Sequence, residues 1–243
     1  MSTPAEERTD KVANREYSDV HRLDERLRFP TEPSRLNARR LIVPWVLAHV
    51  RDGDRIVDIA GGIGTYASLL VRERPVSVVG VDISPGVIAA RGEDPLLPDN
   101  VVGDMEALPF EPESFDAAMF IAALHHVPDP LPALSEAARV LRPGGQLFAF
   151  EPTSLRARGG NRSIPGSPHE FRMSRAWLLA RMRAAGLDVV ELRRFRVAIR
   201  IMRAMARPTP VMWGISDALD TVLTRIPGVN ALAEVVRIRA TRR

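Results

Sequence analysis

VDIAGGIGTY (57–66) joins a short apolar run to a helical run through a glycine-rich turn. The apolar run, RIVDIA (55–60), is β-branched and leads into glycines, which predicts a buried parallel strand. TYASLLVRER, which follows the turn, predicts a helix. Read from Asp58 the turn has the pattern D-x-A-G-G-x-G, whereas read from Gly62 it has the pattern G-x-G-x-x-A. A strand, a glycine-rich turn and a helix in this order predict the first unit of an open α/β sheet.

The alternation of apolar strands and helical segments continues to residue 152. Further strands are predicted at 76–84, 99–106, 115–123 and 146–152, and helices at 33–50, 85–93 and 129–141, with a turn at RPGG (142–145). Strands that alternate with helices of roughly 10–15 residues indicate a parallel sheet with helices on both faces.

After Pro152 the pattern is less regular. A loop rich in Gly, Ser, Pro and Arg extends to about Pro168, and SRAWLLARMRAAGL (174–187) predicts a helix with Gly186 at its end. DVVELRRFRVAI (188–199) and NALAEVVRIRATRR (230–243) are strand candidates. A long insert with an amphipathic helix separates these two segments.

Composition limits the class of protein. The chain has 243 residues, is 45% hydrophobic and contains no cysteine, so we expect one domain without disulfides or thiolate metal sites, and no metal. No apolar run approaches the ~18 residues that cross a bilayer, and no signal segment begins the chain, which makes a cytoplasmic protein the expectation.

Charge is unevenly distributed along the chain. Residues 1–151 carry a net charge of −8 and residues 152–243 a net charge of +12. Such asymmetry can mark a surface for nucleic acid or membranes. Because Lys11 is the only lysine, a coding bias towards arginine is favoured over a functional basic patch.

Two kinds of ligand suit a glycine-rich turn of this sort. A dinucleotide places its pyrophosphate on backbone N–H groups at the start of the helix, and a carboxylate at Asp58 would repel that group. S-adenosylmethionine has no phosphate and carries a sulfonium and an ammonium group, so a nearby carboxylate is favourable. The sequence therefore favours the methyl donor over NAD.

The next two strand ends support this choice to different degrees. Asp82 ends the second strand, where a carboxylate can bind ribose hydroxyls of either ligand. The third strand ends in GDMEALPF, where Asp104 could accept the exocyclic amine of adenine while Ile83 and Met105 enclose the ring.

Four segments in order resemble the class I S-adenosylmethionine-dependent methyltransferases, most closely the ubiquinone/menaquinone-biosynthesis and natural-product enzymes. They are VDIAGGIGTY, VVGVDIS, GDMEALPFEPESFDAAMFIAALHHVPDP and ARVLRPGGQLFAFEP. Ala60 departs from the family pattern, which has glycine there, and alanine is small enough for this to matter little. The resemblance implies a Rossmann-like, seven-stranded, mostly parallel sheet whose last strand is antiparallel.

The resemblance also implies how one domain, 1–243, is divided. Residues 1–50 would form a helical cap, 51–152 the donor-binding half, and 153–243 the substrate-side half with a lid at about 201–228. Apolar side chains of the lid would line an acceptor pocket: Met202, Met205, Met212, Trp213, Ile215, Leu219, Val222 and Leu223. Arg200, Arg203 and Arg207 lie close by in the sequence and suit an acceptor with a negative group.

The residues expected to bind the donor and its product S-adenosylhomocysteine lie in the quoted segments and in the cap. They are Tyr17, Asp58, Ala60, Gly61, Gly62, Gly64, Asp82, Ile83, Asp104, Met105, Ile121 and His126.

Catalysis requires a base if the acceptor must lose a proton. His125 and His126 follow the fourth strand and Glu151 ends the fifth, so one histidine could take the proton while Glu151 orients its ring. The sequence does not distinguish the two histidines, and the pair could instead only shape the loop.

The base candidates favour O-methylation of a small molecule such as a secondary metabolite. C-methylation of a quinone-like or polyketide-like acceptor is the alternative. Two further alternatives are a nucleic-acid methyltransferase and a donor-binding protein that transfers no methyl group. The segment IAALHH replaces the Asn/Asp-Pro-Pro-aromatic signature of enzymes that methylate a flipped base, so no nucleic acid is expected. A homodimer is left open.

Overall fold

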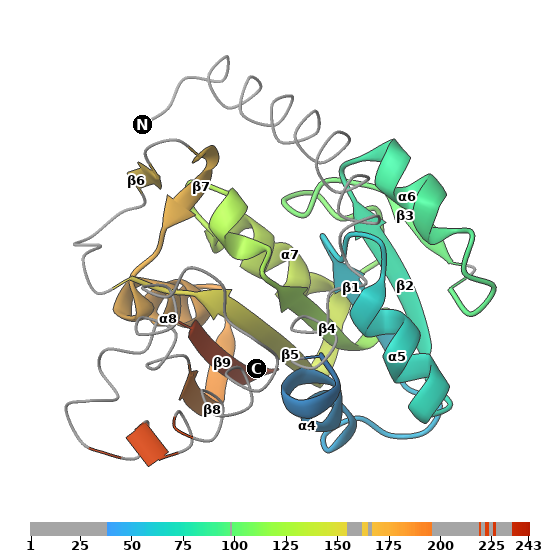
Figure 1. Ribbon diagram of the computed structural model, residues 1–243, viewed down its shortest axis with the longest axis horizontal. Coiled ribbons are helices and arrows are strands. Elements are labelled where there is room, and N and C mark those ends of the chain that lie inside the picture. The colour runs from blue at the N-terminus through green and yellow to red at the C-terminus, as the bar shows by residue number, and fades with distance from the viewer. Residues whose placement is uncertain are drawn as a thin grey trace.

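The structure is a computed structural model that describes residues 38–97, 99–154, 162–164, 167–195, 219, 222, 223, 226 and 235–243. Its centre is a seven-stranded sheet with the strand order β3-β2-β1-β4-β5-β9-β8 (Figure 1). The strands are β1 (Arg55–Ile59), β2 (Ser77–Asp82), β3 (Asn100–Val102), β4 (Phe115–Ile121), β5 (Leu141–Pro152), β8 (Leu187–Phe195) and β9 (Val235–Arg242). β1 to β5 pair in parallel, whereas β9 is antiparallel to both β5 and β8. The predicted Rossmann-like sheet with an antiparallel last strand is therefore confirmed.

Helices cover both faces of the sheet because its strands are apolar on both sides. They are η2, a π-helical turn (Ala38–Ile42), α4 (Val43–Leu47), α5 (Thr65–Glu73), α6 (Pro85–Arg91), the 3-10 turn η3 (Leu124–His126), α7 (Leu131–Val140) and α8 (Arg175–Ala184). Along β1, Ile56 belongs to the core under α4 and α5, while Val57 and Ile59 belong to the core under α7 and α8. This alternation is the period of two that a strand buried on both faces requires.

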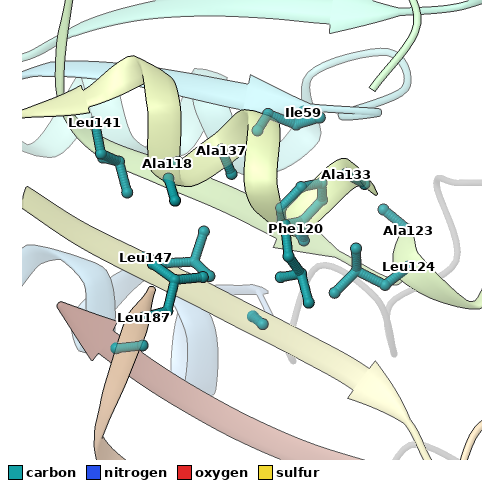
Figure 2. Packing of buried hydrophobic residues seen from close by; sticks show 14 of the residues in the cluster. Ile59, Ala118, Phe120, Ala123, Leu124, Ala133, Ala137, Leu141, Leu147 and Leu187 are labelled. Carbon is teal, nitrogen blue, oxygen red and sulfur yellow. The ribbon is translucent and has the colours of Figure 1, made fainter. Parts of the chain in front are cut away.

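The core under α7 is rich in alanine and leucine. Ala133 and Ala137 of α7 lie over Phe120 of β4, and Leu147 of β5 packs beside Leu187 (Figure 2). Small helical side chains allow α7 to approach the sheet closely, so the larger side chains of the strands fill the space between them. No helix in the described part of the chain combines the length and hydropathy that a membrane span needs.

Two sequence predictions of local structure are wrong. RPGG was expected as a turn, but residues 142–145 belong to β5, where the register against β4 shifts between Phe115 and Ala117 and Gly144 adopts a φ of 76°. The loop expected up to Pro168 contains an antiparallel pair, β6 (Arg162–Ile164) and β7 (Ser167–Arg172). Glycine and proline in both segments mark local turns, and they concealed strands that depend on pairing with distant residues.

Candidate functional site

The predicted site residues lie at one edge of the sheet, the edge formed by the carboxyl ends of its parallel strands. Asp58, Asp82, Ile121 and Glu151 lie at the carboxyl ends of the parallel strands β1, β2, β4 and β5, and Asp104 follows β3. The strand order reverses between β1 and β4, since the chain passes outward through β2 and β3 before it returns to β4. In open α/β sheets ligands bind at this reversal, beyond the carboxyl ends of the strands.

The glycine-rich turn connects β1 to α5 in a left-handed conformation. Ala60, Gly62 and Gly64 have φ values of 52°, 58° and 79°, and Gly64 is the N-cap residue of α5. The Gly62 N–H donates to Asp82 Oδ2 at 3.2 Å, so the turn is attached to the end of β2. Alanine is small enough to fit this turn. Its positive φ nevertheless costs conformational energy, because a residue with a Cβ is disfavoured in the left-handed region.

Asp82 also organises the segment after β2. Its Oδ1 accepts the Ser84 N–H at 3.1 Å, and Ser84 Oγ accepts the Val87 N–H at 3.0 Å, which caps α6. The Asp82 carboxylate is 3% exposed. These backbone contacts fix the Asp82 carboxylate at the end of β2.

The segment after β3 is held by helix α7. Asp104 Oδ1 accepts the Glu106 N–H at 2.9 Å, and Leu108 donates its N–H to Glu136 Oε2 at 2.8 Å. Arg139 donates to the carbonyl of Leu108 at 3.0 Å and forms an ion pair with Glu136 at 2.8 Å. The hydrogen bond from Arg139 lowers the pKa of Glu136, against a burial effect that raises it, and the Leu108 N–H lowers it further.

Apolar residues flank this acidic edge. Ile83 and Met105 are half-buried, and Met105 packs on the core under α7. Ile121 is buried and belongs to the core on the other face. The edge therefore combines carboxylates with apolar side chains. This combination suits a positively charged nucleoside, because carboxylates can bind its hydroxyl and cationic groups and apolar side chains can pack on its base.

Asp58 has a partner that the sequence did not indicate. Its Oδ2 lies 2.8 Å from Nη1 of Arg91, the last residue of α6, and both side chains are 1% exposed. Arg91 was missed because it reads as an ordinary basic residue in the last turn of a helix.

His125 and Glu151 form a hydrogen-bonded pair. Nδ1 of His125 lies 3.1 Å from Glu151 Oε2, and Glu151 is fully buried. Glu151 Oε1 accepts the N–H groups of Ala123 and Leu124 at 2.8 and 2.9 Å. The ring of His126 lies against that of His125, with centroids 4.2 Å apart. Of the two histidines, the structure therefore brings His125 into contact with the predicted carboxylate.

This contact determines the state of the imidazole. An ionised carboxylate can only accept, so Nδ1 of His125 carries the proton in the neutral ring and Nε2 keeps its lone pair. The two backbone donors hold Oε1 of Glu151, and Oε2 is the oxygen that faces His125. The pair can thus take up a proton at Nε2 and stabilise the resulting imidazolium.

Other predicted residues lie outside the described part of the chain. These are Tyr17, the lid residues Met202, Met205, Met212, Trp213 and Ile215, and the nearby Arg200, Arg203 and Arg207. Of the remaining lid residues, Leu219 and Val222 are exposed and Leu223 is half-buried.

Part of this chain is similar to known methyltransferases. Residues 57–149 match the family described as a methyltransferase domain. The ubiquinone/menaquinone biosynthesis C-methyltransferase UbiE of Geobacter sulfurreducens is 34% identical over 44% of this chain and 45% of its own length. The 27-O-demethylrifamycin SV methyltransferase of Amycolatopsis mediterranei is 36% identical over 40% of this chain and 38% of its own length.

A solved structure extends the likeness to most of the described sheet. The [4+2]-cyclase SpnF matches with a TM-score of 0.63 and 21% identity, over 84% of this chain and 80% of that protein. At this identity the likeness concerns the fold alone. The chain spans less than half the length of the two curated relatives.

Proposed function

We propose that the chain is a class I S-adenosylmethionine-dependent methyltransferase that methylates a hydroxyl group of a small molecule, a proposal that starts from the match of residues 57–149 to a methyltransferase domain. The cofactor of such domains is S-adenosylmethionine, and solved structures of the same fold contain its product, S-adenosylhomocysteine. The observation that carries the proposal is the contact between His125 and the buried Glu151. It supplies a base next to the edge at which the donor binds.

The donor is assigned to the edge formed by β1, β2 and β4. Asp82 would bind the ribose hydroxyls, Asp104 the exocyclic amine of adenine, and Ile83 and Met105 the faces of its ring. The turn would contact the methionine part of the donor through backbone atoms. The remaining contacts are assigned to Ala60, Gly61, Gly62, Gly64, Ile121 and His126, with Tyr17 of the cap.

The bound donor supplies an activated methyl carbon on a sulfonium. The reaction breaks the bond between sulfur and methyl, forms a bond between the acceptor oxygen and methyl, and releases the hydroxyl proton to Nε2 of His125. Glu151 holds the ring in the tautomer that can accept this proton. Alignment of the two reactants accounts for up to about 7–11 kcal/mol of the barrier, and the base for the deprotonation.

Two variants test the roles of His125 and Glu151. We expect His125→Ala to lower kcat on the order of 10²–10⁴-fold, as the loss of a general base does. Glu151→Gln keeps an oxygen for the Ala123 and Leu124 N–H groups but presents an N–H to His125, which reverses the tautomer, and we expect a similar loss. Turnover is measured with tritiated-methyl S-adenosylmethionine and a panel of phenols and hydroquinones.

Binding of S-adenosylhomocysteine, measured by calorimetry, serves as the control and should stay within about twofold of the unmodified protein in both variants. The assignment is wrong if His126→Ala loses turnover and His125→Ala does not. NMR of the product distinguishes an O-methyl from a C-methyl group. C-methylation is the second candidate, since a relative named as a C-methyltransferase is 34% identical over 44% of this chain and the same base could deprotonate an acidic carbon.

A further inference from the structure

The ion pair between Arg91 and Asp58 lies directly beneath the glycine-rich turn. Arg91 Nη1 contacts Asp58 Oδ2 at 2.8 Å and approaches the carbonyl of Gly62 at 3.5 Å, a weak contact. The N–H of the same Gly62 donates to Asp82. One residue of the turn is therefore attached to Asp82 on one side and faces Arg91 on the other.

Three glycines provide the space for this pair. A Cβ atom on Gly80 of β2 would lie 2.2 Å from Arg91 Nε, and one on Gly61 would lie 2.1 Å from Asp58 Oδ2. A Cβ atom on Gly64 would lie 3.1 Å from Arg91 Cζ and 2.6 Å from Leu97 Cδ1. A Cβ atom closer than 3 Å would force the neighbouring atom to shift, so Gly61 and Gly80 leave the space that the side chains of Asp58 and Arg91 occupy.

The pair is a poor source of stability. Among the described residues, Asp58 Oδ1 and the Nε and Nη2 atoms of Arg91 have no hydrogen-bond partner although they are buried. Removing two charges from water is compensated only when the remaining polar atoms are satisfied, and apolar replacements of such pairs often leave folding unharmed. The benefit of this pair must therefore lie in the arrangement that it imposes.

We propose that Arg91 is a positioning residue of the donor site. It fixes the carboxylate of Asp58 and, through Asp58 and Gly62, the conformation of the turn on which the donor rests. Asp58 then acts by holding the turn, with its charge already compensated, and not by contacting the ammonium group of the donor.

The test separates folding from donor binding with the variants Arg91→Met, Asp58→Asn, the double variant and Arg91→Lys. Each single neutral variant leaves one buried charge alone and should unfold at a lower urea concentration. The double variant removes both charges, so its urea midpoint should return to that of the unmodified protein. Its affinity for S-adenosylhomocysteine should remain weaker on the order of tenfold, because the turn is no longer held.

Arg91→Lys keeps the charge and one donor, so it should recover part of the lost affinity. A matched control, Asp188→Asn with Arg243→Met, removes an exposed ion pair of 2.8 Å at the opposite edge of the sheet and should leave the affinity unchanged. The proposal is overturned if the double variant binds S-adenosylhomocysteine as tightly as the unmodified protein. It is equally overturned if Arg91→Lys folds but binds no better than Arg91→Met. Neither readout depends on the base or the acceptor, so the failure of this proposal is distinct from a failure of the proposed reaction.

Discussion

Ala60 illustrates how a backbone conformation can escape a sequence argument. By size, alanine fits a position where the resemblance to methyltransferases implies glycine, and the sequence alone predicts no penalty. The structure gives this residue a φ of 52°, a region that costs an L-residue with a Cβ roughly 1–2 kcal/mol. The sign of φ depends on how the turn closes between β1 and α5, and composition does not reveal it.

We expect Ala60→Gly to raise the free energy of unfolding by about 0.5–1 kcal/mol. The gain is the relief of the left-handed strain, reduced by the larger conformational freedom of glycine in the unfolded chain. Urea unfolding measures it, with Ala89→Gly on the exposed face of α6 as a control that should lose about 1 kcal/mol. A destabilised Ala60→Gly protein would contradict the assigned backbone conformation.

The orientation of the His125 and His126 side chains could not be predicted from the sequence either. The sequence identified both histidines and Glu151, but neighbouring residues of the 3-10 turn η3 point about 120° apart. Which of them meets Glu151 depends on the angle at which the chain leaves β4. Only the packing of the whole sheet determines that angle.

Elements with a strong local period were predicted well, and elements that rely on distant pairing were not. The helices α5, α6 and α7 and the strands β1, β2 and β4 lie where the sequence placed them, within a few residues. The β6–β7 pair and the start of β5 were missed, because β6 and β7 are polar and β5 has a proline and two glycines near its start, and such sequences form strands only against a partner. The attachment of the Asp104 segment to α7 also joins residues far apart in sequence.

That attachment predicts a pH-dependent stability. Glu136→Gln removes the charge that pairs with Arg139, and we expect it to lower the free energy of unfolding by about 1 kcal/mol near pH 7. Because the pKa of Glu136 in the folded protein is below its ordinary value of 4.5, this contribution is present above that value. It is lost as the pH falls through the folded pKa.

Urea unfolding at about pH 7 and about pH 3.5 measures the difference between the two proteins, which should shrink at the lower pH. Glu73→Gln, an exposed change on α5, is the control and should cause little difference at either pH. A difference for Glu136→Gln that grows towards acid would show that the carboxylate is not stabilised by Arg139.

On the scale of the whole molecule, one arginine connects segments from both ends of the described chain. Arg237 of β9 lies 4.7 Å from the ring of Trp45 in α4 and 5.3 Å from that of Phe195 in β8. It donates to Glu191 at 3.0 Å and to the carbonyl of Leu41 at 3.2 Å. Glu191 also lies within 4 Å of other basic groups, so part of the positive charge of residues 152–243 is used inside the fold.

We expect Arg237→Met to lower the free energy of unfolding by about 2 kcal/mol, since it removes the cation between two rings and leaves Glu191 without its nearest donor. Arg193→Met is the matched control. Arg193 lies 3.5 Å from the same carboxylate but is 67% exposed, and its loss should cost less than about 0.5 kcal/mol. Chemical unfolding followed by tryptophan fluorescence distinguishes the two variants, and equal effects would refute the role assigned to Arg237.

Among the strands of the described residues β9 comes last in the sequence, yet it lies inside the sheet between β5 and β8. Until residues 235–242 have left the ribosome, β5 and β8 lack the neighbour that separates them, and Val236, Ile238 and Ala240 are missing from the core. Open strand edges of an unfinished sheet can pair with other chains. The interval of synthesis between Pro152 and Val235 is therefore the period in which a nascent chain of this protein is exposed to aggregation.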